Sequence, residues 1–415
     1  MQSTTKGLRL HIGLFGRRNV GKSALLNAFT RQEVSIVSET AGTTTDPVEK
    51  AMELRPLGPV LFVDTAGVDD SGALGALRVQ KTMQVVDRTD FAILATDDWQ
   101  DYEHRLLQMF QKKRLPVLVV ATKSDLRAPD AASKLESDAL ADGAASVVPC
   151  SAVTGAGMDA LRQAVITSAP EPFLEAPALI GDLVRAGDLV VLVVPVDIEA
   201  PKGRLILPQV QTLRELLDVN AYAMVVKEHE LGDALARLRQ PPALVVTDSQ
   251  AFRKVSSLVP AGVPLTSFSI LYARFKGDLA TLVRGARAID RLCPGDRVLI
   301  AEACTHHPSG DDIGRVKIPH WLEQAAGGKL KIEIAPGSAD PPDLESYRLI
   351  VHCGACVWNR RQMLSRLERA RTAGVEITNY GLAIAHCLGI LDRALAVFPD
   401  ASNIYDATVT KTAGL

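Results

Sequence analysis

Apolar positions recur in short runs along the chain, and each run is followed by a loop and then by a stretch with helical spacing. The runs are apolar on both faces, which is typical of strands buried in a parallel sheet, and their alternation with helices predicts βαβ units. In the first third of the chain, the predicted strands are Leu8–Phe15, Val60–Val63, Phe91–Ala95, Val117–Ala121 and Ser146–Pro149. The predicted helices include Ser23–Thr30, Tyr102–Lys113 and Ala131–Asp142.

Two breaks in this pattern predict three consecutive α/β domains, at residues 1–170, 177–276 and 277–415. The first break is the proline-rich stretch that begins at Ala169, and the second, less sharply marked, follows Gly277. Strands predicted for the second domain are Leu189–Val196, Tyr222–Val226, Leu244–Thr247 and Leu265–Phe268, with helices at Val210–Leu217, Leu231–Arg239 and Gln250–Leu258. Strands predicted for the third are Arg297–Ala303, Leu330–Ile334, Leu349–Val351 and Val375–Ile377, with helices through Leu292, at Arg360–Ala373 and at Ala383–Leu391.

Composition narrows the class of protein. A chain of 415 residues with 47% hydrophobic and 23% charged residues is an ordinary globular one, and six cysteines are too few for a disulfide framework. The formal charge of −2 argues against binding nucleic acid or an anionic membrane by bulk charge. Apolar runs such as Leu189–Val196 are too short to span a membrane, and no signal-peptide core stands near Met1. We therefore expect a cytoplasmic protein with no nucleic-acid or membrane partner.

A phosphate-binding motif stands between the first predicted strand and the first predicted helix. Residues 16–23 read Gly-Arg-Arg-Asn-Val-Gly-Lys-Ser and fit the pattern G-x-x-x-x-G-K-[ST] in the context that this motif requires. Its backbone N–H groups would surround the phosphates, Lys22 would reach the β- and γ-phosphates, and Ser23 would offer its hydroxyl to Mg²⁺. The residues expected to bind the nucleotide here are Gly16, Asn19, Val20, Gly21, Lys22, Ser23 and Ala24.

Three further polar motifs follow predicted strands, at the sheet edge where open α/β sheets bind ligands. Asp64 can hold Mg²⁺ through water, and the N–H of Gly67 can sense the γ-phosphate. Thr122-Lys123-Ser-Asp125 places a carboxylate that can accept the N1–H and 2-amino group of guanine, a donor pattern that adenine lacks. Ser151 and Ala152 can present backbone N–H groups to the guanine O6.

With these motifs in place, the first 170 residues resemble the small GTP-binding fold, in the branch of the MnmE and Era-type GTPases. The resemblance implies a P-loop GTPase domain with a mostly parallel sheet. The segment 40–46, Thr-Ala-Gly-Thr-Thr-Thr-Asp, matches that branch's switch and implies Thr44, rather than Thr43, as a second Mg²⁺ ligand. Asn19 matches the asparagine that helps bind K⁺ in such proteins. Val68 replaces a water-orienting glutamine, so we expect slow hydrolysis that needs K⁺, dimerisation or a partner. Thr122 departs from the usual Asn, which weakens a contact to the base.

Cysteine and histidine gather after two strands of the third predicted domain. Cys304-Thr-His306-His307 follows Arg297–Ala303, and His352-Cys353-Gly-Ala-Cys356 follows Leu349–Val351. If these strands are parallel neighbours, both groups meet at one edge of a sheet. Three thiolates with one histidine or one open position suit zinc or an iron–sulfur cluster, and spacing alone does not choose between them. A redox C-x-x-C and plain buried cysteines are the alternatives.

The last 230 or so residues resemble the FeFe-hydrogenase maturation GTPase family, HydF. The resemblance rests on Gly187-Asp-Leu-Val, on Ala200-Pro-Lys-Gly-Arg-Leu, and on the runs 296–304, 311–319, 352–356, 359–361 and 378–381. It implies a four-iron four-sulfur cluster on Cys304, Cys353 and Cys356, with an exchangeable fourth position near His306 or His352. It also implies that the segment from Pro177 to about Lys276 is a dimerisation domain.

The sequence therefore favours a GTP-binding scaffold that holds a 4Fe-4S cluster and, by resemblance, carries a two-iron precursor to the apo FeFe-hydrogenase. The implied partners are that apoprotein, the radical-SAM maturation enzymes and further copies of the chain, as a homodimer or higher oligomer. The other hypotheses are an RNA-linked GTPase of the MnmE or Era kind and a GTPase with a structural zinc. We expect the remaining cysteines to have plain packing roles: Cys150, Cys293 and Cys387.

Overall fold

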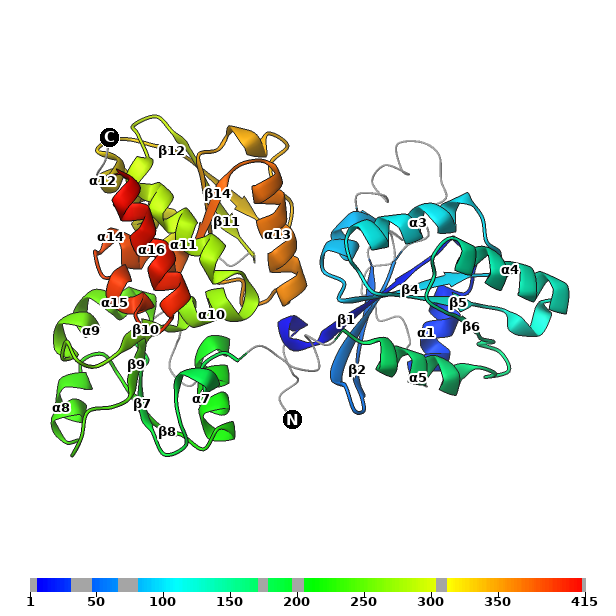
Figure 1. The fold of residues 1–415 in the computed structure, drawn as a ribbon, viewed down its shortest axis with the longest axis horizontal. Coiled ribbons are helices and arrows are strands. Elements are labelled where there is room, and N and C mark those ends of the chain that lie inside the picture. Colours follow the sequence, from blue (N-terminus) through cyan, green and yellow to red (C-terminus); the bar gives the residue numbers. More distant parts are fainter. Residues whose placement is uncertain are drawn as a thin grey trace. The chain divides into compact units, whose positions relative to one another are not determined.

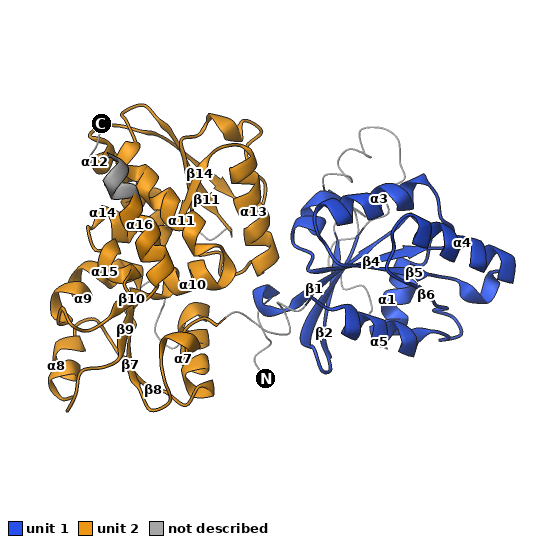
Figure 2. Cartoon of the chain, viewed as in Figure 1, with its two compact units in different colours: residues 1–176 blue, residues 177–415 orange. Residues whose placement is uncertain are grey.

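The computed structural model describes residues 6–30, 47–65, 81–170, 178–195, 205–303 and 312–412. It divides the chain into two compact units, residues 1–176 and residues 177–415 (Figures 1 and 2). The described residues of the second unit form two separate sheets. The division of that unit into domains at residues 177–276 and 277–415 stays a prediction.

Among its described residues, the first unit has a six-stranded sheet in the order β2-β3-β1-β4-β5-β6, in which only the edge strand β2 runs antiparallel. Helices α1 and α5 pack on one face of this sheet, and α3 and α4 pack on the other. The predicted α/β class with a mostly parallel sheet is therefore confirmed. The strands are β1 (Leu10–Phe15), β2 (Val48–Leu54), β3 (Gly58–Asp64), β4 (Phe91–Thr96), β5 (Val117–Ala121) and β6 (Val147–Pro149), and the helices are α1 (Lys22–Thr30), α3 (Asp101–Lys112), α4 (Pro129–Ala141) and α5 (Met158–Ser168).

The pattern of apolar positions does not predict strand β2. Its alternating residues leave it partly exposed, in contrast to the fully buried strand β1. An antiparallel edge strand has one neighbour and one solvated side, so it lacks the continuous apolar run by which the other strands were recognised.

The first sheet of the second unit is parallel, in the order β10-β9-β7-β8. Strand β8 is an edge strand, and it exposes Tyr222 and Val225 to 67% and 45%. Its strands are β7 (Leu189–Val193), β8 (Tyr222–Val226), β9 (Leu244–Thr247) and β10 (Leu265–Ser267), and the helices of this segment are α7 (Leu207–Asp218), α8 (Leu231–Ala236), α9 (Phe252–Leu258) and α10 (Phe268–Lys276).

The second sheet of this unit is also parallel, in the order β12-β11-β13-β14. Helices α11 and α13 cover one face, and α12 and α14 cover the other. Helix α11 lies so close to β14 that a side chain on Gly285 would meet the Ile377 carbonyl. The strands are β11 (Arg297–Glu302), β12 (Lys331–Pro336), β13 (Leu349–His352) and β14 (Glu376–Asn379), and the helices are α11 (Leu279–Arg287), α12 (Ile318–Ala326), α13 (Arg360–Thr372), α14 (Tyr380–Cys387), α15 (Leu391–Leu395) and α16 (Pro399–Thr412).

One continuous hydrophobic core joins the two sheets of the second unit. It contains Val191 and Val245 of the first sheet together with Leu299 and Ile350 of the second, and helix α10 contributes Leu271 between them. None of the described helices combines the length and the apolar composition that a membrane-spanning helix needs.

Candidate functional site

The phosphate-binding motif forms a tight loop between β1 and α1. Gly16 and Gly21 have φ angles of +142° and +93°, which glycine adopts readily, and a side chain on Gly16 would lie 2.1 Å from the Ala95 carbonyl oxygen. Lys22 is 7% exposed, and its Nζ donates hydrogen bonds to the carbonyls of Gly16 (2.8 Å) and Arg17 (2.6 Å). The ammonium is thus held within the loop that would surround the phosphates.

Ser23 and Asp64, both predicted to serve Mg²⁺, are brought into direct contact. The Ser23 hydroxyl donates to Oδ2 of Asp64 at 2.6 Å. The other carboxylate oxygen, Oδ1, is buried without a hydrogen-bond partner in the described part of the chain, and burial raises the pKa of Asp64. A buried carboxylate with an unsatisfied oxygen beside a hydroxyl is a donor set that fits hydrated Mg²⁺. Thr44, Gly67 and Val68 lie outside the described residues.

The loop predicted to read guanine is tied to the phosphate loop. Thr122 is 4% exposed, and its hydroxyl donates to the Val20 carbonyl at 2.6 Å. Lys123 has a φ of +54° and forms an ion pair of 2.7 Å with Asp97 at the end of β4. Asp125 is exposed in the short helix Ser124–Leu126 that follows, so its carboxylate is open to a ligand.

The two residues predicted to face the guanine O6 differ in their hydrogen bonds. The Ser151 N–H donates to the Ala156 carbonyl at 2.9 Å, and the Ser151 hydroxyl accepts from the Thr154 N–H at 3.1 Å. Because the Ser151 amide is engaged within its own turn, the predicted contact with the base now rests mainly on Ala152.

Arg17 and Glu103 form a link that the sequence did not reveal. Glu103 is fully buried in the first turn of α3, and its Oε1 accepts a hydrogen bond of 2.8 Å from Nε of Arg17. Arg17 also lies 3.4 Å from Asp97, the partner of Lys123. The phosphate-loop motif leaves position 17 undefined, so the sequence pattern carries no signal for this ion pair.

The second predicted site lies where β11 and β13 end. These strands are parallel neighbours, with Ala301 opposite His352, so the condition for bringing the two cysteine groups together is met. The N–H of Ala303 donates to Sγ of Cys353 at 3.1 Å. Ala303 is the residue before Cys304 in the chain, so this hydrogen bond joins the end of the β11 segment to the first cysteine of the second group. Cys304, His306 and His307 themselves lie outside the described residues.

We call residues 353–356 the cysteine turn. Ala355, between the two cysteines, has a φ of +50° and is 2% exposed. Cys353 and Cys356 are each partly exposed. In the described ranges, no three or more His, Cys, Asp or Glu side chains are grouped closely enough to hold a metal ion. The chemistry of the turn nevertheless fits a cluster, because two thiols share one short turn and one sulfur already accepts a backbone N–H.

His352, a candidate fourth ligand, is a core histidine. It is 0% exposed, its Nδ1 donates to the Cys353 carbonyl at 2.7 Å, and its ring meets that of Trp358 edge-on at 5.0 Å. Its Nε2 is buried with no hydrogen-bond partner in the described part of the chain. Burial lowers the pKa of His352 to about 3, so the ring is neutral, as a metal ligand must be.

The other cysteines divide into two kinds. Cys150 is fully buried, and burial raises the pKa of its thiol to about 11. Cys387 packs against the core of the second sheet, and burial raises its pKa to about 12. For these two residues the predicted packing role is confirmed. The prediction is wrong for Cys293, which is exposed after the helical turn Ala288–Arg291.

Comparison with known families decides between the classes of protein that these two sites allow. Residues 179–277 match the model of the hydrogen maturase F dimerization domain, and residues 280–397 match that of the hydrogen maturase F tetramerization domain. Together the two matches take in just over half of the chain. The chain belongs to the hydrogen maturase F (HydF) family. Residues 11–123 match the 50S ribosome-binding GTPase model, so this HydF-family chain contains a GTPase domain. The matches to a dimerization and a tetramerization domain support a homo-oligomer.

Curated relatives share the GTPase domain. The chain is 38% identical over 124 residues to GTPase Der from Wolinella succinogenes, across 28% of this chain and 26% of that protein. It is 37% identical over 174 residues to the tRNA modification GTPase MnmE from Bordetella parapertussis, across 41% of this chain and 36% of that one. The chain thus spans about a quarter to a third of the length of these relatives. The predicted resemblance to the MnmE branch is confirmed for the first domain.

Solved structures of GTPases are also similar to this chain. The crystal structure of Aquifex aeolicus Era bound to GDP and AlF₄⁻ is 23% identical and covers 60% of this chain and 97% of that one, with a TM-score of 0.34. The G domain of the Thermotoga maritima FeoB iron transporter is 24% identical over 39% of this chain and 99% of that one, with a TM-score of 0.29. Both scores are too low to add to the argument from the family models.

Proposed function

We propose that this protein is a GTP-hydrolysing scaffold that binds a 4Fe-4S cluster and carries a two-iron precursor for maturation of FeFe-hydrogenase. The observation that carries the proposal is the hydrogen bond from Ala303 to the Cys353 sulfur, in a chain of the HydF family. Backbone amides that donate to cluster sulfurs are one means by which proteins tune such centres. When bound, the cluster supplies an iron site at which the precursor can be held.

The residues proposed to hold the cluster are Cys304, Cys353 and Cys356. The last two share the cysteine turn, and Cys304 follows the residue that donates to Cys353. His352 is neutral and has a buried nitrogen without a partner among the described residues, which supports it as a candidate for the fourth position. His306 is the other candidate.

GTP hydrolysis is proposed to depend on Lys22, Ser23, Thr44 and Asp64, with the Gly67 N–H sensing the γ-phosphate. Lys22 is the cation of the phosphate loop, and Ser23 with Asp64 presents oxygen donors to Mg²⁺. Asp125 selects guanine, and Asn19, whose φ is +61°, helps bind K⁺. GTP is proposed to change the affinity for the apo FeFe-hydrogenase and for the radical-SAM maturation enzymes, through the order of the switch segments.

The oligomer is proposed to use strand β8. This strand pairs with β7 alone among the described strands and exposes Tyr222 and Val225. An exposed edge with unpaired backbone groups and apolar side chains is a surface on which the same edge of a second copy can add. The family name of this segment, a dimerization domain, supports the same assignment.

Anaerobic purification followed by iron, acid-labile sulfide and zinc analysis tests the cluster. We expect about four iron and four sulfide per chain. Cys353→Ala should lose both while GTP hydrolysis persists, and Cys293→Ala, at an exposed cysteine, should keep both. A colourless protein that contains zinc and no iron would reject the cluster and indicate a structural zinc site.

Partner binding tests the role of GTP. Affinity for apo FeFe-hydrogenase should differ among the GTP-bound, GDP-bound and nucleotide-free protein. Equal affinities in the three states would reject the switch, and they would leave the cluster assignment to stand on the metal analysis.

A further inference from the structure

A buried ammonium lies directly against the cysteine turn. Lys276 is the last residue of α10 and is 2% exposed. Its Nζ donates to the carbonyl of Cys356 at 3.1 Å and also to the carbonyl of Trp358. Burying a lysine is costly unless its charge is satisfied, and these two carbonyls and the Tyr272 ring, whose centroid lies 5.5 Å from Nζ, satisfy it. The lysine thus links the end of the matched dimerization domain to the cysteine turn.

A second cation makes the same kind of contact in the opposite direction. Arg360 is the first residue of α13, just after the cysteine turn, and its Nη1 approaches the last carbonyls of α10. The three distances are 3.3 Å to Arg274, 2.8 Å to Phe275 and 2.9 Å to Gly277. Positive charge at a helix C-terminus is favourable, because the final carbonyls have no partner within the helix. Lys276 of α10 therefore binds carbonyls in and just after the cysteine turn, and Arg360 of α13 binds carbonyls at the end of α10.

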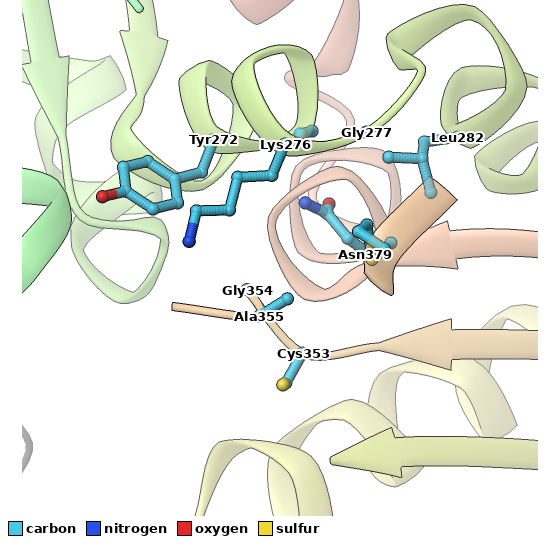
Figure 3. Close-up of a pocket in the computed structure, with 10 residues that line it drawn as sticks. Tyr272, Lys276, Gly277, Leu282, Cys353, Gly354, Ala355 and Asn379 are labelled. Carbon is cyan, nitrogen blue, oxygen red and sulfur yellow. The ribbon is translucent and has the colours of Figure 1, made fainter. Parts of the chain in front are cut away.

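A small pocket that is partly open to solvent lies between these segments. Figure 3 shows Tyr272 and Lys276 of α10 on one side of this pocket, and Cys353, Gly354 and Ala355 of the cysteine turn on the other. The turn is thus held from the α10 side while its Cys353 sulfur accepts the N–H of Ala303 from the β11 side.

We propose that Lys276 and Arg360 are positioning residues that hold the cysteine turn in the geometry required to bind the cluster. The proposal rests on the proposed function, since it concerns the same turn. It adds that the last helix of the dimerization domain fixes the ligand loop of the following domain. Replacing Lys276 with Met removes two charge-assisted hydrogen bonds to main-chain carbonyls, and such bonds are about twice as strong as neutral ones.

We call the contacts of Lys276 and Arg360 that hold the cysteine turn the clamp. Hydrogen exchange in the iron-free, full-length protein tests the clamp without reference to a cluster. Amides of residues 353–359 should exchange at least about tenfold faster in Lys276→Met and in Arg360→Gln, because the turn opens more often. Lys276→Arg should recover part of the protection, and Lys254→Met, at an exposed lysine of α9, should leave it unchanged. If Lys276→Met does not fold, Arg360→Gln decides. Unchanged exchange in the folded variants would overturn the proposal.

The reconstituted protein supplies a second readout that simple loosening of the fold would not produce. Loss of the ammonium disfavours the more negative, reduced cluster, so Lys276→Met should shift its midpoint potential to a more negative value. Lys276→Arg retains the charge and should stay near the wild type. An unshifted potential in Lys276→Met would count against the clamp. If the wild type takes up no iron at all, the proposed function fails, and the exchange measurement still decides the clamp.

Discussion

The hydroxyl of Thr122 donates a hydrogen bond of 2.6 Å to the main-chain carbonyl of Val20, and so joins the loop expected to read the base to the loop expected to hold the phosphates. Thr122 also lies 3.1 Å from the Thr96 carbonyl at the end of β4. A short hydroxyl side chain at this position therefore connects the phosphate loop with the ends of β4 and β5.

Removing that hydroxyl should weaken nucleotide binding. Thr122→Val keeps the shape but leaves the Val20 carbonyl without this donor, and the dissociation constant for GDP should rise about tenfold. Thr122→Asn restores a donor and should bind at least as tightly as the wild type. Isothermal titration calorimetry measures both, with Thr372→Val in α13 as the control. Equal affinity of Thr122→Val and wild type would show that the bond has no part in binding.

Asp64 should oppose stability while it serves function. Burial raises its pKa because it disfavours the ionised form, so near neutral pH the folded protein keeps a carboxylate in surroundings that destabilise its charge. Asp64→Asn retains an acceptor for Ser23, and it should raise the melting temperature of the nucleotide-free protein while Mg²⁺-dependent GTP hydrolysis falls by at least about 100-fold.

The difference in melting temperature between Asp64→Asn and the wild type should depend on pH. The stabilisation by Asp64→Asn should narrow as the pH is lowered toward the raised pKa of the wild-type carboxyl, because protonation in the folded state removes the buried charge. Scanning calorimetry at several pH values measures it. Asp159→Asn, at an exposed carboxylate of α5, is the matched control. A melting temperature for Asp64→Asn below that of the wild type at pH 8 would contradict the argument.

His11 should make the first unit sensitive to acid. Its ring is 3% exposed, with Nδ1 3.1 Å from the Arg88 carbonyl and Nε2 2.9 Å from the Lys6 carbonyl. Burial outweighs these acceptors and lowers the pKa from 6.5 to about 4. The stability contributed by the neutral ring is complete above pH 6.5 and is lost as the pH falls toward 4, up to about 3 kcal/mol.

His11→Gln carries no titrating ring, so it should lose less stability than the wild type between pH 7 and pH 5. Thermal unfolding of the full chain at these two values measures the difference, with the exposed His229→Gln as control. The interpretation fails if His11→Gln is as acid-sensitive as the wild type.

The β8 edge should carry the association of chains. Val225→Lys adds a solvated charge to the exposed strand, a device by which natural edge strands avoid pairing, and the dimer dissociation constant should rise at least tenfold. Light scattering coupled to size exclusion measures the mass. Val153→Lys, at a residue that is 88% exposed in the first unit, should leave the mass unchanged. An unchanged mass for Val225→Lys would show that the chains do not associate through the β8 edge.

The sequence was sufficient where chemistry depends on residues close together in the chain. The loop from Gly16 to Ser23 has the spacing and the flanking elements typical of a phosphate site, and the buried strands have continuous apolar runs. The parallel pairing of β11 with β13 could be anticipated because strands that alternate with helices form parallel sheets.

The contacts that hold the two sites had no comparable signal. Thr122 and Val20 are about a hundred residues apart, and the bond between them joins a side chain to a main-chain carbonyl. Nothing in the sequence near Lys276 shows that its ammonium will meet the Cys356 carbonyl. Such contacts follow from the packing of whole elements, and a carbonyl acceptor is present at every residue.

The core that runs from Val191 and Val245 to Leu299 and Ile350 has a consequence for how the second unit unfolds. Cutting the chain between the two matched domains would expose apolar surface on both fragments at once, so neither sheet would keep its full stability alone. Heat or denaturant should therefore melt residues 177–415 as a single cooperative block. Two modules that count as separate families would then behave as one folding unit.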